Sequence, residues 1–499
     1  MPASSPEPAP VAPLHHDEPF PLSIGRYAIE DGLEVALAPA FAPLLREVAL
    51  RDFAAVSRRL REWAAAPRLV LPHPVAGGVD TEARRCVQMG LVNFVFFSDA
   101  DGGHRWILAQ ALNLVDAIVL PGRIVHSLPR HRIAVRKALG DLLLRERTLV
   151  HLFEGAAPFA GFLVSHKTPF HFFYDLLKNV PPLVDAAQAA GKALYHRPEQ
   201  TFFPLAAIAG GVPVRHLDEA AGAVVVYPAT IQQNDLNALG LVYRESVPAA
   251  RPGAVPHAQG PLVSAAMRAL ETRIAGYALE GAAPAAPAPG ALSLWIGISD
   301  FKRSWKQQVE GFASLIGWLH AHVPDLEVVF DGMTAPAGLR VESPSETAVV
   351  DAIRALLPAP VRVTSLVGMD YPGKIRVGRR VDAFVCDAGT AALVPLRFCG
   401  KPGVMFSNGH IHSFPDRYAQ PVAMLERRLV VPDGDTTARE AQFKSVHIFW
   451  KDVGAALVEV LNAAQSRALP PLPVPASERR AFREALGLAA PAPAEGASP

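Results

Sequence analysis

Residues 381–406, VDAFVCDAGTAALVPLRFCGKPGVMF, contain two short apolar runs separated by a helical segment. The run Asp382–Cys386 predicts a buried strand, and Gly403–Phe406 predicts the next strand along the chain. Between them, the turn Asp387–Gly389 leads into a helix that ends at Gly400. Pro395 lies inside this helix and predicts that it is short or kinked. The stretch therefore indicates a parallel βαβ unit with a right-handed crossover.

The same alternation extends toward the N-terminus. Apolar runs predict strands at 292–298, 326–330 and 361–364, and Val309, Phe312, Ile316 and Leu319 share one face of a helix that begins near Ser304. The sequence Ser343-Pro344-Ser345-Glu346 predicts the start of a further helix, with an N-cap, a first-turn proline and a capping-box glutamate. The C-terminal part is therefore expected to be a doubly wound α/β layer.

Chain length and local composition predict the domain boundaries. A chain of 499 residues exceeds what one core usually serves, and residues 281–290, GAAPAAPAPG, have the composition of a linker. We expect an N-terminal α/β domain at 22–280 and a C-terminal α/β domain at 291–466. Residues 1–21 are rich in Pro and Ala and predict a disordered tail, and 467–499 predict a helix followed by another such tail.

The first domain is less regular than the second. Apolar runs predict strands at 91–97, 117–120, 149–153, 162–164 and 224–226, some of them antiparallel between 91 and 128. Helical patterns fit residues 130–146, 170–178, 181–191 and 262–275.

The charge balance and the cysteine content argue against several classes of function. The 48 Lys and Arg residues nearly balance the 47 Asp and Glu residues, so nucleic acid is not an expected partner. Cys86, Cys386 and Cys399 are too few and too scattered for a disulfide framework or a zinc site, and we interpret them as buried thiols. With no apolar h-region near Met1 and no run of 18 apolar residues, a cytoplasmic protein is expected; a peripheral contact with the inner face of a membrane stays open.

Two loops should reach the carboxyl edge of the parallel sheet, where ligands bind in such folds. The first, Gly297–Lys306, places Ser299 and the cations Lys302, Arg303 and Lys306 near a helix start, where a diphosphate would be favourable. The second contains Asp387, Gly389 and Thr390; its glycine permits a close backbone approach to a ligand. A solvated basic turn and an ordinary strand-to-helix turn are the alternatives for these two loops.

Residues 381–406 resemble the late βαβ unit of GT-B glycosyltransferases, in which a small Gly/Thr turn precedes a helix that binds the donor diphosphate. Gly400-Lys401-Pro402 matches the turn that opens the next strand in that fold. The resemblance implies two Rossmann-like α/β domains facing a cleft, with a nucleotide sugar held by the second domain and no obligatory cofactor or metal.

Residues 162–183, FLVSHKTPFHFFYDLLKNVPPL, are similar to a segment of glycosyltransferase family 61, although the Asn and Trp of that family's motif are missing. The similarity implies that this segment lines the cleft. His166 and His171 are then candidate bases for the acceptor hydroxyl, because the pKa of histidine suits proton transfer near neutral pH. Asp175 lies four residues after His171 and could orient it on a helix.

Two further motifs have competing interpretations. His410 and His412 follow the strand 403–406 and are candidate donor contacts or ordinary loop residues; no carboxylate or cysteine nearby completes a metal site. Asp99-Ala100-Asp101 has the spacing of the metal-binding D-x-D of the GT-A fold, but Gly102-Gly103 favours a hairpin turn.

The expected function is transfer of a sugar from a nucleotide-activated donor to a glycan, a lipid-linked saccharide or a protein, by direct displacement. The alternatives are a nucleotide-sugar epimerase of the same fold and a catalytically inactive paralogue that binds glycans or serves as a scaffold.

Overall fold

The computed structural model describes residues 19–31, 35–49, 52–127, 132–229, 260–277, 290–300, 303–408, 421–434 and 444–487. Contacts within the chain divide it into two compact units. The first unit comprises Met1–Val164, Pro182–His196 and Ala209–Ile231, and the second comprises Ser165–Pro181, Arg197–Ile208 and Gln232–Pro499. None of the helices in the described ranges has the length and apolar character needed to cross a membrane.

This division differs from the expected boundary at the linker. Residues 165–181, 197–208 and the helix α7 (Gly260–Tyr277) precede the linker in sequence, yet they belong to the second unit. The linker itself, 281–290, lies outside the described residues except for Gly290, as do most of the two terminal tails.

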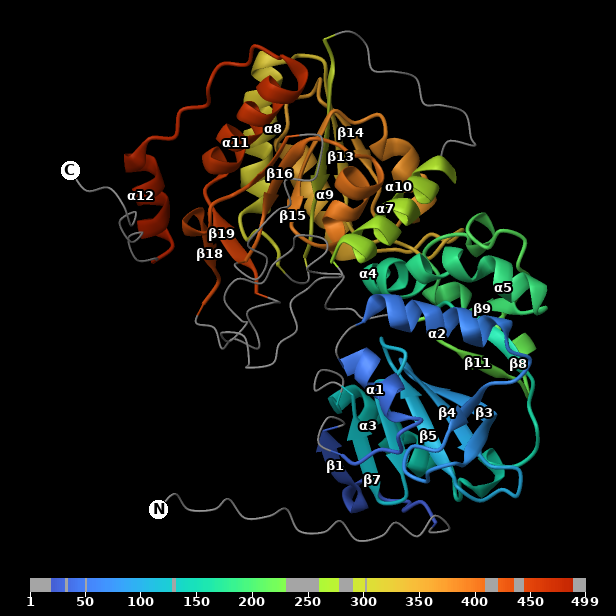
Figure 1. Ribbon diagram of the computed structural model, residues 1–499. Helices are drawn as coiled ribbons and strands as arrows, with labels where there is room; N and C mark the ends of the chain where they lie inside the picture. Colours follow the sequence, from blue (N-terminus) through green and yellow to red (C-terminus); the bar gives the residue numbers. More distant parts are fainter. Residues whose placement is uncertain are drawn as a thin grey trace, which may run out of the picture. The chain divides into compact units, whose positions relative to one another are not determined.

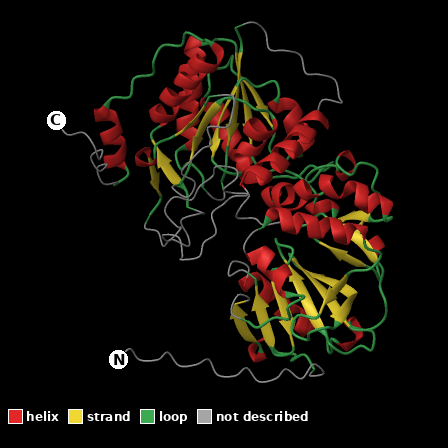
Figure 2. Ribbon diagram, viewed as in Figure 1, coloured by secondary structure: helices red, strands yellow, loops and turns green. Residues whose placement is uncertain are grey.

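The first unit contains two sheets and several helices (Figures 1 and 2). Its strands are β1 (Ala28–Asp31), β2 (Val70–Pro72), β3 (Asp80–Met89), β4 (Val92–Ser98), β5 (Trp106–Gln110), β6 (Ala117–Leu120), β7 (Arg123–His126), β8 (Phe159–Leu163), β9 (Ala193–His196), β10 (Val214–His216) and β11 (Val224–Val226). Its helices are α1 (Ala42–Ala49), α2 (Phe53–Ala65), α3 (Arg132–Arg145) and α5 (Val184–Ala189).

The larger sheet of the first unit has the order β1-β7-β6-β5-β4-β3-β2. Only the β1–β7 pair in it is parallel, whereas the pairs from β7 to β2 are antiparallel. The antiparallel strands expected between 91 and 128 are therefore confirmed, and the description of this domain as Rossmann-like does not fit the larger sheet. The smaller sheet, β10-β9-β8-β11, is parallel throughout.

One strand expected in this unit is wrong. Residues 149–153 form a 3₁₀ turn over Val150–Leu152 instead. Leu149, Leu152 and Phe153 are buried while Val150 and His151 stay exposed. The apolar run therefore reflects packing of one side of a turn against the core, a pattern that a short window does not separate from a strand.

The second unit contains the parallel layer that the sequence predicts (Figures 1 and 2). Its main strands are β12 (Leu292–Gly297), β13 (Leu326–Asp331), β14 (Arg362–Ser365), β15 (Ala383–Asp387), β16 (Gly403–Phe406) and β17 (Val422–Met424), with a separate antiparallel pair, β18 (Val430–Pro432) and β19 (Val446–Ile448). Its helices are α4 (Pro169–His171), α7, α8 (Gln308–His322), α9 (Pro344–Leu356), α10 (Tyr371–Gly378), α11 (Trp450–Gln465) and α12 (Ala476–Ala485).

The six strands of this sheet are parallel and have the order β14-β13-β12-β15-β16-β17. In chain order the strands first run outward from β12 to β14 and then continue from β15 on the other side of β12. This is the doubly wound order, in which the direction of winding reverses between the first and fourth strands. Right-handed crossovers then place the helices on both faces of the sheet.

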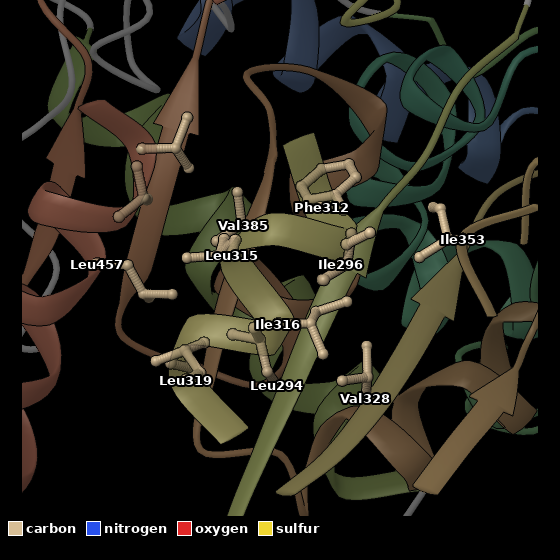
Figure 3. Packing of buried hydrophobic residues seen from close by; sticks show 14 of the residues in the cluster. Leu294, Ile296, Phe312, Leu315, Ile316, Leu319, Val328, Ile353, Val385 and Leu457 are labelled. Atoms are coloured by element: carbon tan, nitrogen blue, oxygen red, sulfur yellow. The ribbon is translucent and has the colours of Figure 1, made fainter. Parts of the chain in front are cut away.

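The buried core on one face of the sheet joins β12, β13 and β15 to three helices (Figure 3). Leu294, Ile296, Val328 and Val385 project from the strands, where residues of one face alternate along the chain. They pack against residues of α8, α9 and α11, namely Phe312, Leu315, Ile316, Leu319, Ile353 and Leu457. Trp295 belongs to the opposite face, where it lies close to Gly378 at the end of α10.

The structure confirms one local sequence signal in this unit and contradicts another. The helix around Pro395 is short and irregular, with a 3₁₀ turn η10 (Thr390–Ala392) followed by π-helical residues η11 (Leu393–Phe398), as a proline without an N–H group predicts. Helix α9 begins at Pro344, but Ser343 makes no side-chain cap, so the predicted capping box is wrong. Glu346 instead accepts a hydrogen bond from Met333 N, because its carboxylate turns toward the loop after β13.

Candidate functional site

The carboxyl ends of β12 and β15 form the switch point of the parallel sheet. The two strands are neighbours, and the connections that leave them lead to helices on opposite faces. Connections that diverge in this way leave a crevice beyond the strand ends, which is where α/β sheets of this type bind ligands. The two loops that the sequence predicts as donor-binding, 297–306 and 387–390, are the loops at this point.

A small hollow lies at the switch point. Four of the predicted donor-binding residues line it: Gly297, Ser299, Arg303 and Asp387. The other lining residues, which the sequence did not predict as donor contacts, are Ile298, Ser304, Trp305, Gln308, Phe312 and Phe406.

Arg303 is held in an unusual backbone conformation. Its φ of 56° is in the left-handed region, which costs a residue with a Cβ atom roughly 1–2 kcal/mol. Its Nε lies 3.3 Å from Asp387 Oδ2, so an ion pair joins the loop after β12 to the end of β15. Strained residues of this kind occur preferentially at ligand sites, where the surrounding structure maintains them.

The absence of a side chain at Gly389 leaves space for the Arg303 guanidinium. A Cβ atom at position 389 would lie 3.0 Å from Arg303 Nη1 and 3.1 Å from Nη2. The backbone of Gly389 is extended, so the glycine is required by this close approach and not by its torsion angles. Thr390 follows as the first residue of η10. A Cβ atom at 389 would therefore push the guanidinium aside by a few tenths of an ångström.

Gln308 and Trp305 shape the loop after β12. The Gln308 side chain donates to Ser299 O at 2.9 Å and accepts from Ser299 N at 3.4 Å, so one amide binds both backbone polar groups of Ser299. Trp305 is buried, donates from Nε1 to Ile448 O at 3.0 Å, and packs edge-on against Phe312. A Cβ atom on Gly311 would lie 2.3 Å from the Trp305 ring. The only sequence signal for these contacts is a glutamine at the first position of α8.

Of the remaining donor candidates, the structure describes Lys306. Lys306 does not line the hollow; its Nζ lies 3.2 Å from Asp433 Oδ2, and Asp433 also accepts from His447. The hydrogen bonds from His447 and Lys306 lower the pKa of Asp433. Lys302, His410 and His412 lie outside the described residues.

The histidine segment follows β8 and belongs to the second unit. His171, at the end of α4, lies 2.6 Å from Asp175 through its Nδ1 and the Oδ2 atom. Asp175 is fully buried, whereas His171 keeps about a fifth of its side chain exposed. His166 is buried, accepts a hydrogen bond from Thr168 N at 2.9 Å, and packs its ring against that of His171 at 4.9 Å.

Residues 172–176 are π-helical, and a buried network fixes them to the second unit. Tyr174 donates to Glu271 Oε1 at 2.8 Å, and Arg397 of η11 donates to the same oxygen at 2.7 Å. The Arg397 guanidinium also lies over the Tyr174 ring at 4.9 Å. Phe173 packs edge-on against Tyr371, the first residue of α10, at 4.9 Å. The His171–Asp175 pair therefore belongs to the same unit as the hollow.

The Asp99 motif is a hairpin turn, as the following glycines indicate. Asp99 O accepts from Gly102 N at 3.2 Å, Oδ1 accepts from Gly103 N at 2.8 Å, and Oδ2 contacts His104 Nδ1 at 2.5 Å. Burial acts to raise the pKa of Asp99, but the hydrogen bonds from His104 and Gly103 outweigh it and lower that pKa. Within the described ranges, no three His, Cys, Asp or Glu side chains are placed to hold a metal ion.

Comparison with models of known protein families gives no match, and comparison with curated proteins gives none either. Among solved structures, the chain is similar to the GtfA/B complex, with 10% identity and a TM-score of 0.24 over 84% of this chain and 66% of that one. It is also similar to UDP-GlcNAc 2-epimerase from Neisseria meningitidis bound to UDP-GlcNAc, with 14% identity and a TM-score of 0.19 over 55% and 64%.

A third similar structure is a mutant of S. aureus TarM in complex with Fondaparinux, alpha-GlcNAc-glycerol and UDP. It shares 8% identity and a TM-score of 0.21, over 82% of this chain and 75% of that one. The chain thus spans less than two thirds of the first two structures' lengths. All three TM-scores lie below 0.5.

Proposed function

We propose that the protein is a glycosyltransferase that uses a nucleotide-activated sugar. The observation that supports it best is the hollow at the switch point of the doubly wound sheet, with Arg303 held beside it by Asp387 and Gly389. A doubly wound sheet binds nucleotides at this point, and an arginine there suits a diphosphate.

In this proposal Arg303 binds the donor diphosphate. A guanidinium carries five N–H donors, and the contact of Arg303 with Asp387 involves its Nε, so in this proposal the Nη groups bind the phosphate oxygens. Ser299, Ser304 and Trp305 line the same hollow. During transfer, Arg303 would stabilise the negative charge that develops on the leaving nucleoside diphosphate.

His171 is the base that we propose for the acceptor hydroxyl. Its Nδ1 is engaged with the buried carboxylate of Asp175, and that contact fixes the orientation of the ring. An imidazole that a carboxylate holds in this way is oriented for proton transfer, and the carboxylate stabilises the imidazolium that forms. His166 packs against His171 and would act as a positioning residue. The acceptor in this proposal is a glycan, a lipid-linked saccharide or a protein hydroxyl.

The test begins with ligand binding to the purified chain. A ligand that binds the folded state raises the apparent melting temperature, so UDP, GDP, dTDP and their sugar conjugates are compared in a thermal-shift series. We expect at least one nucleoside diphosphate to raise the melting temperature, with a smaller effect from the matching nucleoside. If none of the nucleotides changes it, the proposal is wrong.

Activity separates transfer from the alternatives. With the nucleotide sugar that binds, a transferase releases nucleoside diphosphate faster when a glycan acceptor is added. An epimerase would change the sugar configuration without any acceptor and without releasing the nucleotide at a matching rate. Binding without turnover under both conditions would favour the inactive paralogue.

A further inference from the structure

Helix α3 of the first unit carries the two most exposed large apolar side chains among the described residues. Leu144 is 87% exposed and Ile133 is 68% exposed. The helix already packs its inward side into the core of this unit, where Val135, Leu139 and Leu142 are buried. A surface helix of this kind normally presents a polar outward side to solvent. The apolar side chains on the outward side of α3 therefore need a separate explanation.

Leu144 and Ile133 lie on one line along the helix. They are separated by roughly 16 Å at 1.5 Å per residue, and Lys137 and Gly140 lie between them at helical spacing, so all four share one face. Gly140 has no side chain, and Ile24 packs over this position, since a Cβ atom at 140 would lie 3.9 Å from Ile24 Cγ2. The line is therefore apolar at both ends and near its middle.

A second segment of the chain contributes to this surface. Ile24 is the first residue of the 3₁₀ turn η1 (Ile24–Arg26), which precedes β1, and it is partly buried against the core. Leu22, just before the turn, is 49% exposed, and Arg26 at its end is also exposed. We call the outward face of α3, together with residues 22–26, the α3 surface.

The α3 surface has a positive charge. Residues 132–147 contain five Lys and Arg residues against two Asp and Glu residues, so their net charge is +3. Arg136 and Arg145 are exposed, and at 100° per residue they flank the apolar line on opposite sides. Lys137 is exposed on the line itself. Cations thus border the apolar side chains, and Arg26 adds a further one.

Charge and composition favour an anionic lipid surface over a protein as the partner. A second copy of the chain would bring like charge against the α3 surface, which disfavours association. Protein interfaces are centred on aromatic and arginine anchors in pockets, whereas the exposed apolar residues here are aliphatic and stand on a convex helix. Aliphatic side chains bordered by Lys and Arg are the composition with which helices lie at the headgroup boundary of a membrane.

We propose that the α3 surface is a site of peripheral contact with membranes that contain anionic phospholipids. Leu144 and Ile133 enter the boundary between headgroups and acyl chains, and Arg136, Lys137 and Arg145 contact the lipid phosphates. The contact is reversible, since two aliphatic side chains and a few cations bind far more weakly than a spanning helix. This inference goes beyond the proposed function and does not depend on the nucleotide site.

The experiment is co-sedimentation of the purified full chain with lipid vesicles. Vesicles of phosphatidylcholine alone are compared with vesicles in which roughly a quarter of the lipid is phosphatidylglycerol, at low and at high salt. Leu144→Ser and Ile133→Ser remove the apolar contacts, and the pair Arg136→Gln and Lys137→Gln removes charge. All four side chains are exposed, so the variants should fold, and thermal melting checks this.

The matched controls lie on α9 of the second unit. Leu356→Ser replaces the last residue of that helix, whose side chain is 57% exposed, and Arg354→Gln replaces an exposed arginine next to it in the chain. Neither belongs to the α3 surface. Both should bind vesicles as the wild type does.

We expect the wild type to bind the vesicles with phosphatidylglycerol, to bind phosphatidylcholine alone more weakly, and to lose affinity at high salt because salt screens the cations. Leu144→Ser should lower the partition coefficient about tenfold, since a leucine no longer leaves water. Each Gln substitution should lower it about fivefold, the effect of one cation near an anionic membrane. Ile133→Ser should act in the same direction as Leu144→Ser.

Three outcomes would overturn the inference. The first is a wild type that does not bind the vesicles with phosphatidylglycerol. The second is binding that the α3 variants leave unchanged, or that Leu356→Ser weakens as much as Leu144→Ser does. The third is a wild-type dimer in sedimentation velocity that Leu144→Ser dissociates, because the surface would then join two copies of the chain. The assay contains no nucleotide, so its result and that of the nucleotide-binding test are separate.

Discussion

The two large sheets of the molecule use their polar residues differently. In the antiparallel sheet of the first unit, polar side chains at strand ends satisfy the turns. Asp116 is buried, and its Oδ2 accepts from the backbone N–H groups of Leu112 and Asn113, each at 3.0 Å, and of Ala111. In the parallel sheet of the second unit, Ser299, Arg303 and Asp387 follow strands whose carboxyl ends meet at one edge.

The difference follows from sheet geometry. Antiparallel neighbours are joined by tight turns that alternate between the two edges, so each turn needs its own capping group. Parallel neighbours are joined by crossovers through helices, so loops from non-consecutive strands gather at the same edge. An aspartate after a strand is therefore a poor indicator of function in the first unit and a better one in the second.

We expect the largest effect from variants of the His171–Asp175 pair. His171→Gln removes the proposed base while keeping a polar side chain, and we expect turnover to fall about 10²–10⁴-fold with unchanged donor affinity. Asp175→Asn should act in the same direction, because it disturbs the contact with Nδ1. The measurement is the initial rate of nucleotide release against pH, with and without acceptor.

The matched control is His322→Gln. His322 lies at the end of α8, is exposed, and contacts Trp318 O at 2.8 Å through Nδ1, so its loss should leave turnover unchanged. Wild-type turnover and an unaltered pH profile in both His171→Gln and Asp175→Asn would place the base elsewhere.

A second variant addresses the first unit. Asp116→Ala leaves three backbone N–H groups without their carboxylate, and we expect the free energy of unfolding to fall by about 3 kcal/mol. Nucleotide affinity of the folded protein should not change. Chemical denaturation measures the first quantity and isothermal titration the second.

Asp141→Ala on the exposed side of α3 serves as its control and should stay within about 0.5 kcal/mol of wild type. A loss of nucleotide affinity in folded Asp116→Ala, with little loss of stability, would reverse the roles that we assign to the two sheets.

Variants of Arg303 test the proposed donor site of the second unit through nucleoside diphosphate affinity alone. Arg303→Ala should weaken nucleoside diphosphate binding by about 1.5–3 kcal/mol, the range for a charge-assisted contact. Arg303→Gly should lose the same affinity without loss of stability, since glycine relieves the positive φ. Arg354→Ala, on α9 in an exposed pair with Asp351, is the control. Equal affinities in all three variants and the wild type would mean that the arginine is structural.

The smallest predicted effect is on the rate at which the cysteine thiols of both units react. Burial raises the pKa of Cys86 in the first unit, and in the second it raises the pKa of Cys386 and brings that of Cys399 to about 12. At pH 8 all three should be thiols and react slowly with iodoacetamide, while unfolding in guanidinium makes them reactive. Rapid labelling of any of them in the native protein would contradict the raised pKa values of these thiols.

Sequence patterns predicted the second unit better than the first, for physical reasons. Buried parallel strands are continuous apolar runs, and β12, β13, β15 and β16 match the expected ranges closely. In the first unit, β3 mixes charged and apolar residues over Asp80–Met89, and no pattern indicated it. The contribution of residues 165–181 to the second unit depends on contacts such as Tyr174–Glu271, 97 positions apart, which no local pattern reveals.

Some residues of the candidate site could be predicted from the sequence, and others could not. Residues at or just beyond the ends of β12 and β15, such as Gly297, Ser299 and Asp387, could be inferred from the order of elements, and so could Arg303 in the loop after β12. Trp305, Gln308 and Phe406 could not, because they line the hollow through contacts among β12, α8 and β16 that depend on side-chain packing. The contact of Lys306 with Asp433 is likewise a tertiary feature that charge spacing alone does not show.

Hydrogen exchange with and without a saturating nucleoside diphosphate tests the central claim most directly, because it reports both sheets in one experiment. The account predicts slower exchange in peptides covering 297–308 and 385–392 of the second unit, with no change in peptides covering β3 to β5 of the first. Protection confined to the first unit, or protection that leaves both loops at the switch point unchanged while the nucleotide is bound, would contradict it.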